Sequence, residues 1–177
     1  MAFAATALAT GILVTFLPPA VPSGSAAAAT VALLVQPAAS TAARWVAGRY
    51  GDRHGSARLV VPGLLLSAAG VLTLVLTASQ VAVVAGAAVF GAGLGITQNA
   101  TLSLVHARAD RPSYGAITAL WNLAYDAGIG TGAGAFGLVA GYTGYPWAFA
   151  LTAAAMLLAL GPALRDAGRV TSGRRPR

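Results

Sequence analysis

The stretch "AGRYGDRHGSARLV", residues 47–60, decides the fold class, because it concentrates charge between two long apolar runs that carry almost none. Four charged side chains are spaced by three glycines: Arg49, Asp52, Arg53 and Arg58, with Gly48, Gly51 and Gly55. Only 8% of the 177 residues are charged and 57% are hydrophobic, whereas a soluble domain carries about 25% charged residues. The composition therefore indicates a chain whose main solvent is lipid.

The charge and the residue types exclude several classes of protein. The formal net charge is +7, but the basic residues cluster between apolar runs and not along a polar face, so we expect no nucleic-acid partner. The chain has no cysteine, and its two histidines, His54 and His106, have no acidic cluster beside them, so we expect no metal site. No Ser/His/Asp arrangement, carboxylate pair or phosphate loop is recognisable, so we expect no enzyme and no cofactor.

Six apolar stretches are long enough, or nearly so, to cross a bilayer, which takes about 20 helical residues. They cover residues 2–17, 26–46, 59–77, 81–105, 114–141 and 147–164. The sequence therefore predicts an all-α membrane domain of six transmembrane helices over residues 1–164. A basic cytoplasmic tail without regular structure is expected over residues 165–177.

Prolines mark the expected ends of several helices. Pro18 and Pro19 are expected to end the first helix, because proline lacks the amide donor and clashes with the preceding turn. Three more lie near expected helix starts, where proline costs little: Pro62, Pro112 and Pro146. Pro37 falls inside the second predicted helix and should kink it, with neighbouring helices satisfying the freed carbonyl.

All eleven arginines fall on one side of this six-span arrangement, and the other three connections carry no charge. By the positive-inside rule the charged side is cytoplasmic, so we expect a multi-pass protein of the cell membrane with both termini in the cytoplasm. A secretory signal peptide is the alternative for residues 2–17, but "MAFAATALAT" has no positive n-region. Because this first span is short and begins at residue 2, we expect the chain to be a piece of a longer protein.

The spacing of the charged stretch resembles the signature loop of the major facilitator superfamily, G-x-x-x-D-R-x-G-x-[RK]. The matching residues are Gly48, Asp52, Arg53, Gly55 and Arg58, and Arg44 resembles the family's usual arginine at the end of the preceding helix. In that family the loop joins the second and third helices of a half, which is its place here too. Ser56 departs from the pattern, since a basic residue is common there.

Two helices extend the resemblance over nearly the whole chain. "GAAVFGAGLGITQNATLSLV", residues 86–105, is similar to the glycine-rich fourth helix of a half. "NLAYDAGIGTGAGAFGLVAGYTGY", residues 122–145, resembles the eleventh helix of bacterial drug- and sugar-efflux permeases. The resemblance implies the C-terminal six-helix half, a 3+3 repeat, of a transporter that exports a small molecule by proton-coupled alternating access.

The family has twelve spans, so a six-span chain implies a second six-helix half as partner. That half would be a separate chain, a missing segment or a second copy. In the family, the Asp and Arg of the loop contact the neighbouring half and stabilise one state, which implies a conformational latch at Asp52 and Arg53. A polar turn that only obeys the positive-inside rule is the alternative for the stretch.

Polar side chains inside the predicted spans are the candidates for substrate and proton contacts. Asp126 is costly at bilayer depth and could exchange a proton during transport, and it shares a helix face with Asn122, next to Tyr125. A permanently neutral Asp126 that packs between helices is the alternative. Gln98 and Asn99 are further candidates, with interhelical hydrogen bonding as the equally open alternative.

A polar line of Gln36 and Ser40 leads to Arg44 on the second predicted helix. The resemblance implies that this helix lines the central cavity together with the first, fourth and fifth. Glycine pairs with four-residue spacing predict close helix packing. They are Gly91/Gly95, Gly128/Gly132 and Gly130/Gly134.

The sequence thus predicts transmembrane transport by half of a two-part bundle in the lipid bilayer. The alternative is a self-standing six-helix membrane protein that works as a homodimer or as a scaffold without transport. The apolar composition with a few amides suits an amphipathic small-molecule substrate, although sugars are equally compatible with it.

Overall fold

The structure, a computed structural model, describes residues 2–161 as an all-helical bundle, which confirms the predicted all-α class. Three 3-10 turns and six α-helices follow one another in the described residues. In chain order they are α1 (Ala2–Ala20), η1 (Ser23–Ser25), α2 (Ala26–His54), η2 (Ser56–Leu59), α3 (Val60–Thr73), α4 (Gln80–His106), η3 (Arg111–Ser113), α5 (Tyr114–Thr143) and α6 (Tyr145–Leu158). The expected tail over residues 165–177 lies outside the described residues.

Within residues 2–161, four helical segments are long and apolar enough, by length and composition, to cross a membrane. They are Ala2–Ala20, Ser23–His54, Ser56–Thr73 and Gln80–His106. Helix α6 is a shorter apolar helix, and α5 has 30 residues, about 45 Å at 1.5 Å per residue. These lengths suit a multi-pass membrane protein, because about 20 helical residues cross a bilayer. A helix also satisfies its own backbone polar groups, which lipid cannot do.

Helix α1 is longer than predicted, because Pro18 and Pro19 do not end it. The helix continues to Ala20, and the amide of Val21 still donates to the carbonyl of Leu17 at 3.3 Å. Both prolines are exposed in the last turn. In that position each proline removes one i→i−4 hydrogen bond and crowds only the turn before it, and the helix ends one residue later.

The charged stretch is mostly helix, which corrects the prediction that helix 26–46 ends before it. Helix α2 continues for eight more residues, to His54, and its C-cap Gly55 has φ 90°. Nothing in residues 47–54 forces a break, whereas Gly55 adopts a backbone conformation that other residues rarely reach. Most charged residues of this stretch therefore lie in the last turns of α2, and the turn that follows them is short.

The remaining helices differ from their predicted ranges by smaller amounts. Helix α3 ends at Thr73, four residues before the predicted end, and turns lead on to α4. Helix α6 begins at Tyr145, two residues early, because Pro146 fits its first turn. Of the predicted span 147–164, residues 162–164 lie outside the described part.

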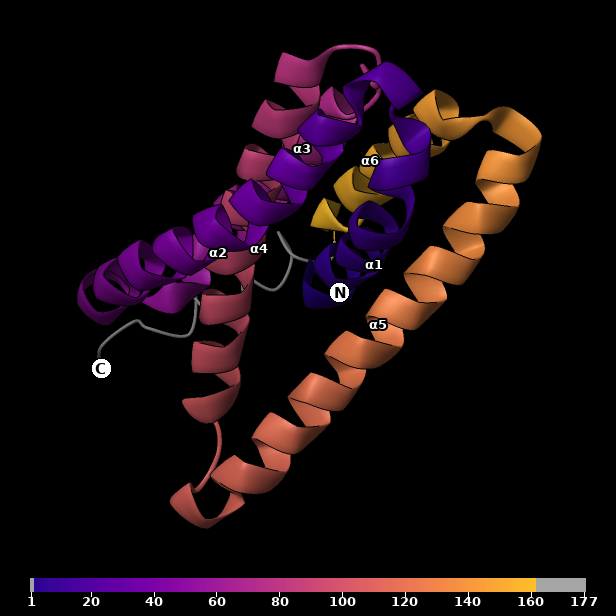
Figure 1. The fold of residues 1–177 in the computed structure, drawn as a ribbon. Coiled ribbons are helices and arrows are strands. Elements are labelled where there is room, and N and C mark those ends of the chain that lie inside the picture. Colours follow the sequence, from indigo (N-terminus) through magenta and orange to yellow (C-terminus); the bar gives the residue numbers. More distant parts are fainter. Residues whose placement is uncertain (1, 162–177) are drawn as a thin grey trace.

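Two of the helix contacts fit an internal repeat of three helices, whereas the extensive α3–α4 contact has only a slight counterpart between α6 and α1. Helix α4 packs between α2 and α3, α1 packs along α5, and α3 packs on α6 (Figure 1). Exchanging α1, α2 and α3 with α4, α5 and α6 turns the α2–α4 contact into the α5–α1 contact, and it leaves α3–α6 unchanged. The predicted 3+3 arrangement is consistent with these contacts.

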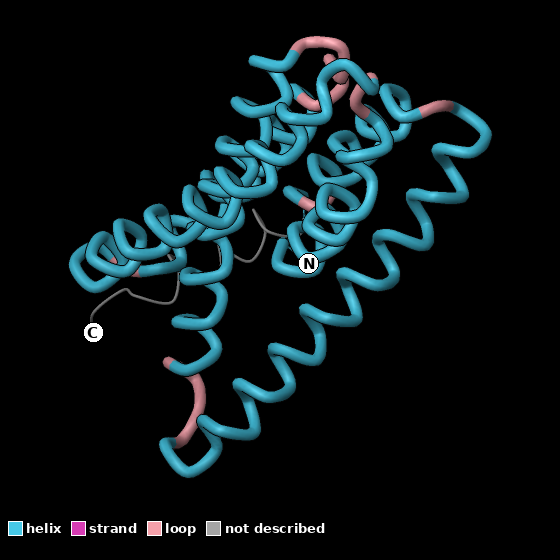
Figure 2. Tube along the Cα trace, viewed as in Figure 1, coloured by secondary structure: helices cyan, strands magenta, loops and turns pink. Residues whose placement is uncertain are grey.

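The connections separate by charge at the two ends of the bundle. The connections α1–α2, α3–α4 and α5–α6, which carry no charged residue, gather at one end (Figure 1). The arginine-bearing connections α2–α3 and α4–α5 lie at the other end, where loops interrupt the helical trace (Figure 2). This separation is what the positive-inside rule requires of a membrane protein.

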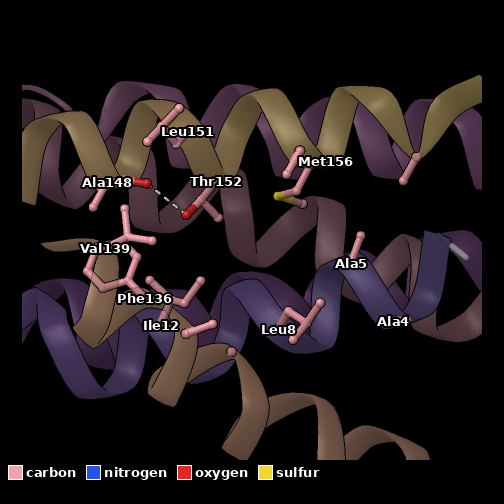
Figure 3. Close-up of a pocket in the computed structure, with 14 residues that line it drawn as sticks. Ala4, Ala5, Leu8, Ile12, Phe136, Val139, Ala148, Leu151, Thr152 and Met156 are labelled. Atoms are coloured by element: carbon pink, nitrogen blue, oxygen red, sulfur yellow. Dashed lines mark hydrogen bonds between the residues drawn. The ribbon is translucent and has the colours of Figure 1, made fainter. Parts of the chain in front are cut away.

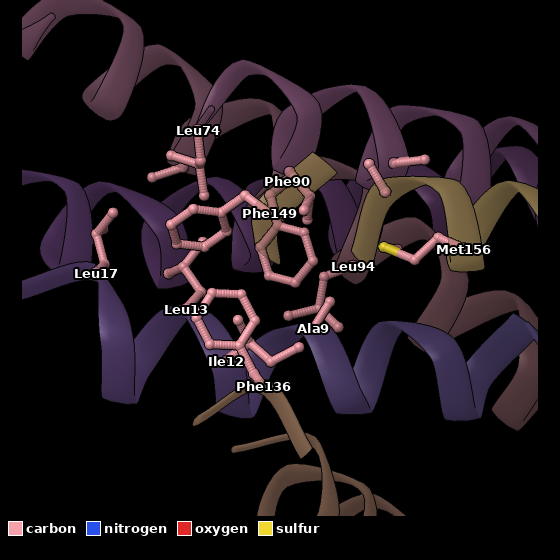
Figure 4. Close-up of a cluster of buried hydrophobic side chains, with 14 of the residues drawn as sticks. Ala9, Ile12, Leu13, Leu17, Leu74, Phe90, Leu94, Phe136, Phe149 and Met156 are labelled. Carbon is pink, nitrogen blue, oxygen red and sulfur yellow. The ribbon is translucent and has the colours of Figure 1, made fainter. Parts of the chain in front are cut away.

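Aromatic rings fill the centre of the bundle where α1, α4, α5 and α6 meet (Figure 4). Phe90 and Phe149 are fully buried, and the rings of Phe136 and Phe149 lie 5.0 Å apart at a tilt of 50°. Leucines from α1 and from the residue after α3 surround them: Leu13, Leu17 and Leu74. In lipid these contacts stabilise the bundle by dense packing, because apolar side chains are no better solvated outside it.

Glycines set the distance between α4 and its neighbours. A Cβ on Gly91 would lie 2.2 Å from the carbonyl oxygen of Gln36, and one on Gly95 would lie 2.1 Å from that of Ser40. On the opposite face, a Cβ on Gly93 would meet the amide nitrogen of Ser67 at 2.3 Å. The predicted close packing at Gly91 and Gly95 is therefore confirmed.

The glycines of α5 pack on one face only. A Cβ on Gly132 would lie 2.3 Å from the carbonyl oxygen of Leu8, and one on Gly128 would meet Ala7 at 2.7 Å. No atom lies within 4 Å of the Cβ positions of Gly130 and Gly134. The predicted close packing of this last pair is wrong within the described chain, because the pair lies on the far side of α5 from α1.

We predict that Gly95→Ala lowers the free energy of unfolding by roughly 1–3 kcal/mol, because the added methyl group must displace the α2 backbone. Gly134→Ala is the matched control, since it adds the same methyl group to an open helix face and should cost nothing. Denaturant titration of the purified protein in detergent, followed by circular dichroism, measures both. Equal stability of the two variants would contradict the packing of α2 on α4.

Candidate functional site

A line of polar side chains follows the contact between α2 and α4. Gln36 and Ser40 are buried on α2, and the guanidinium of Arg44 donates a hydrogen bond to Oε1 of Gln98 on α4. Gln98 is only 5% exposed, whereas Arg44 is exposed. The structure therefore joins two predicted site residues, and it orients the arginine through a buried amide.

Asn99, the next residue of α4 after Gln98, also lies against α2. Its amide nitrogen would lie 3.5 Å from a Cβ on Gly48, so Asn99 sits over the C-terminal part of α2. Its Oδ1 is buried without a hydrogen-bond partner among the described residues, as is Oγ of Ser40. Buried polar atoms normally have a partner. These two oxygens have none among the described residues, and both can still accept a hydrogen bond.

The three predicted residues on α5 separate into two groups. Asp126 and Asn122 are exposed, whereas Tyr125 turns toward α1, where its ring lies 5.9 Å from Phe3 and 6.0 Å from Trp121. Helix α5 packs mainly along α1, and α2 packs along α4. The structure therefore keeps Asp126 apart from the Arg44–Gln98 pair within one chain.

A cavity of about 420 Å³ lies between α1, α5 and α6, and Figure 3 shows its lining. Its walls are apolar, with Leu8, Ile12, Phe136 and Met156 among them. The single hydroxyl in the lining, on Thr152, already donates to the carbonyl oxygen of Ala148 at 2.8 Å. None of the predicted site residues lines this cavity, so it has no polar group to orient a substrate.

The predicted latch residues surround the turn between α2 and α3. Arg53 and Asp52 are exposed in the last turn of α2, and Arg58 is exposed in η2. Asp52 caps neither of the following elements, because neither η2 nor α3 has a side-chain cap. Asp52 instead lies at a helix C-terminus, where the macrodipole favours cations.

Aromatic side chains support the charges of this turn, which the sequence analysis did not anticipate. The guanidinium of Arg49 lies 4.0 Å from the ring centroid of Trp45, and Tyr50 stacks on His54 at 4.4 Å. Their four-residue spacing, which places side chains on one helix face, was the available signal. Cation–π contacts of this kind hold a guanidinium at a membrane surface without neutralising it.

A contact at the same end of the bundle ties α4 to α5. The Nε2 atom of His106 lies 3.1 Å from Oγ1 of Thr118, and its ring stacks on Tyr114 at 4.8 Å. The Thr118 hydroxyl donates to the carbonyl oxygen of Tyr114 at 2.8 Å, so it accepts from His106. Within the described residues His106 therefore has a role in packing, and no group of three metal-ligating side chains occurs there.

Three features together define a multi-pass membrane protein of the transporter class. They are the apolar helices, the charged connections gathered at one end and the polar side chains set between the helices. A comparison with family models identifies which transporters these are. The chain belongs to the Major Facilitator Superfamily, whose family model matches residues 1–176. Members of this family move small molecules across membranes and are not enzymes. Comparisons with curated proteins and with solved structures find no match.

We predict that Gly55→Ala destabilises the α2–α3 turn by about 1–3 kcal/mol, because φ 90° is strained for any residue with a Cβ. Gly24→Ala in the α1–α2 connection is the control, since nothing lies within 4 Å of its Cβ position and its φ is ordinary. The unfolding midpoint in detergent reports on both variants. A Gly55→Ala protein as stable as the control would contradict the turn geometry.

Proposed function

We propose that this chain is one six-helix half of an alternating-access transporter that exports an amphipathic small molecule in exchange for protons. The observation that carries the proposal is the hydrogen bond between Arg44 and Gln98. It holds a charged side chain beside a buried amide within two apolar helices, and ionisable residues at such positions mark substrate or ion pathways.

In this proposal the α2–α4 contact forms part of the cavity wall, with the binding site between the two halves near the middle of the bilayer. Gln36, Gln98 and Asn99 supply amide groups, and Arg44 supplies a positive charge. The rest of that wall is apolar, since alanine, valine and glycine dominate the neighbouring turns of both helices. A substrate with an apolar body and a polar end is the class that such a wall accommodates.

Asp126 is the proposed proton-coupling residue. It is exposed on α5 about halfway along a 30-residue helix, so it lies far from either helix end. A carboxyl group at this depth is costly while it is charged, and protonation removes that cost. Alternate protonation can therefore bias the bundle between two conformations, with Asn122 one turn away as a hydrogen-bond partner.

Asp52 and Arg53 are the proposed latch. Both are exposed at the end of α2, and so they are free to contact a second half at the charged end of the bundle. We place this end and both termini in the cytoplasm of a cell-membrane protein, because the uncharged connections gather at the opposite end. Export as the direction of transport follows from the resemblance of α5 to efflux permeases.

A self-standing six-helix protein that acts as a scaffold is the second candidate. The apolar cavity between α1, α5 and α6 favours it, because a hollow without polar groups suits packing against lipid better than substrate recognition. Transport measured in vesicles with the chain alone, and with its presumed second half, separates the two candidates.

We predict that Asp126→Asn abolishes pH-gradient-driven efflux of an amphipathic fluorescent dye from vesicles that contain the complete assembly, while expression is retained. Asparagine keeps the shape and most hydrogen bonds but cannot exchange a proton. Asp110→Asn, in the exposed α4–α5 connection, is the matched control and should leave efflux unchanged. Efflux that survives in Asp126→Asn would refute the coupling role.

We also predict that Asp52→Ala shifts the equilibrium between the two access states without removing dye binding. Accessibility of single cysteines to a membrane-impermeant reagent measures the shift, because the chain has no cysteine of its own. We expect a change of about tenfold in labelling rate, which corresponds to a coupling free energy of about 1.4 kcal/mol. A variant that fails to insert into the membrane would indicate a folding role for Asp52 instead.

A further inference from the structure

Arg44 carries a charge that the bundle orients but does not neutralise. It lies ten residues, or about 15 Å, before the end of α2. Its guanidinium donates to Oε1 of Gln98, which is a neutral group, and within the described residues this is its hydrogen-bond partner. A guanidinium has several N–H donors, so most of the donors and the whole positive charge are available to a ligand.

The register between α2 and α4 places a second donor beside this guanidinium. Gln98, which holds Arg44, is followed on α4 by Asn99. Asn99 lies over Gly48, which is one turn after Arg44 on the same face of α2. Arg44, Gly48, Gln98 and Asn99 therefore meet where the two helices touch.

Gly48 leaves an open gap at this meeting point. A Cβ on Gly48 would lie 3.5 Å from the amide nitrogen of Asn99, and this is its one contact within 4 Å outside the adjoining residues of α2 in the described chain. Because Oδ1 of Asn99 is buried, the amide nitrogen is the atom that faces the gap. We call this gap, bordered by Arg44, Gly48, Gln98 and Asn99, the α2–α4 notch.

The donors around the α2–α4 notch select an anion. A guanidinium binds a carboxylate through two parallel N–H···O bonds, which are stronger than bonds between neutral groups. The amide nitrogen of Asn99 can donate a further bond. A cationic head group would be repelled by Arg44, and the repulsion is stronger among apolar neighbours, such as the buried Ala47, than in water.

We propose that the α2–α4 notch binds the carboxylate of an organic anion, and that this carboxylate is the polar end of the exported amphiphile. The inference deepens the proposed function, on which it rests, because it names the substrate class and the place where its head group binds. Gly48 lies six residues, or about 9 Å, before the end of α2 that leads into the arginine-bearing connection. An exported anion therefore meets the notch on the side from which we propose that it enters.

The test compares three ligands that share one apolar body and differ in the charge of the head group. They are 4-butylbenzoate, 4-butylbenzamide and 4-butylbenzylammonium. Isothermal titration calorimetry of the full chain in a non-ionic detergent, corrected with empty micelles, measures each affinity. We expect the wild-type chain to bind the benzoate at least about tenfold more tightly than the other two.

Two variants of the notch and one control test the assignment of the site. Arg44→Gln should weaken benzoate binding at least about tenfold and leave benzamide binding unchanged, because it removes the charge alone. Gly48→Ala should also weaken benzoate binding, because its methyl group fills the notch. Arg49→Gln removes an arginine of the same helix that stacks on Trp45, and it should bind the benzoate like wild type.

The Gly48→Ala variant keeps the test independent of misfolding. Its added methyl group makes an ordinary contact at 3.5 Å, so the fold accommodates it, and circular dichroism checks that all variants keep their helices. Equal affinity of the wild-type chain for the three ligands would overturn the proposal. Benzoate binding that survives in both Arg44→Gln and Gly48→Ala would overturn it too.

The calorimetric measurement uses neither transport nor a pH gradient, so the two proposals can fail separately. Benzoate binding that depends on Arg44, with no export by the complete assembly, would overturn the proposed function alone. Export of neutral or cationic dyes by an assembly that does not prefer anions would overturn the inference about the α2–α4 notch alone.

Discussion

Close approach of helix backbones at glycine is the contact on which the rest of the bundle depends. In lipid an apolar side chain gains little by turning inward, so association must come from packing and from interhelical hydrogen bonds. Gly91 and Gly95 bring α4 onto the carbonyls of α2, and Gly93 brings the opposite face of α4 onto α3. Helix α4 is thereby fixed between two neighbours, and the side chains that it carries are fixed relative to theirs.

The hydrogen bond between Arg44 and Gln98 is a result of this packing. Gln98 follows Gly95 by three residues, so it stays on the side of α4 that faces α2 and meets Arg44 there. The α1–α5 pair uses the same device at Gly128 and Gly132, but it presents apolar groups toward the cavity of about 420 Å³. Similar glycine packing in the α2–α4 and α1–α5 pairs therefore supports different surfaces, one polar and one apolar.

The sequence predicted those features of the fold that depend on residues close together in the chain. Hydrophobic runs and charge placement predicted the helices and their separation into a charged and an uncharged end, and glycine spacing predicted the contacts of Gly91 and Gly128. Charge alone does not distinguish a loop from the last turns of a helix, so the sequence does not predict the full extent of α2, which only Gly55 ends. Pro18 and Pro19 do not end α1 where the sequence predicts, since each disturbs only the turn before it and the helix continues to Ala20.

The site could be predicted only as a set of residue types. Spacing along a helix placed Gln98 and Arg44 as candidates, but their hydrogen bond depends on the register between α2 and α4, which a single sequence does not encode locally. Asn122, Tyr125 and Asp126 are neighbours in sequence, yet Tyr125 faces α1 and the other two are exposed. Which face of α5 is covered depends on α1, more than one hundred residues away in the chain.

The length of α2 has a mechanical consequence. One continuous helix of 29 residues, about 43 Å, carries Gln36, Arg44 and Asp52. It exceeds the hydrocarbon thickness of about 30 Å, so one end of it must project or the whole must lean. With no loop between them, the three side chains move as points on one rod. A sideways displacement near Gln36 is therefore carried to Asp52 through helical backbone that includes Pro37.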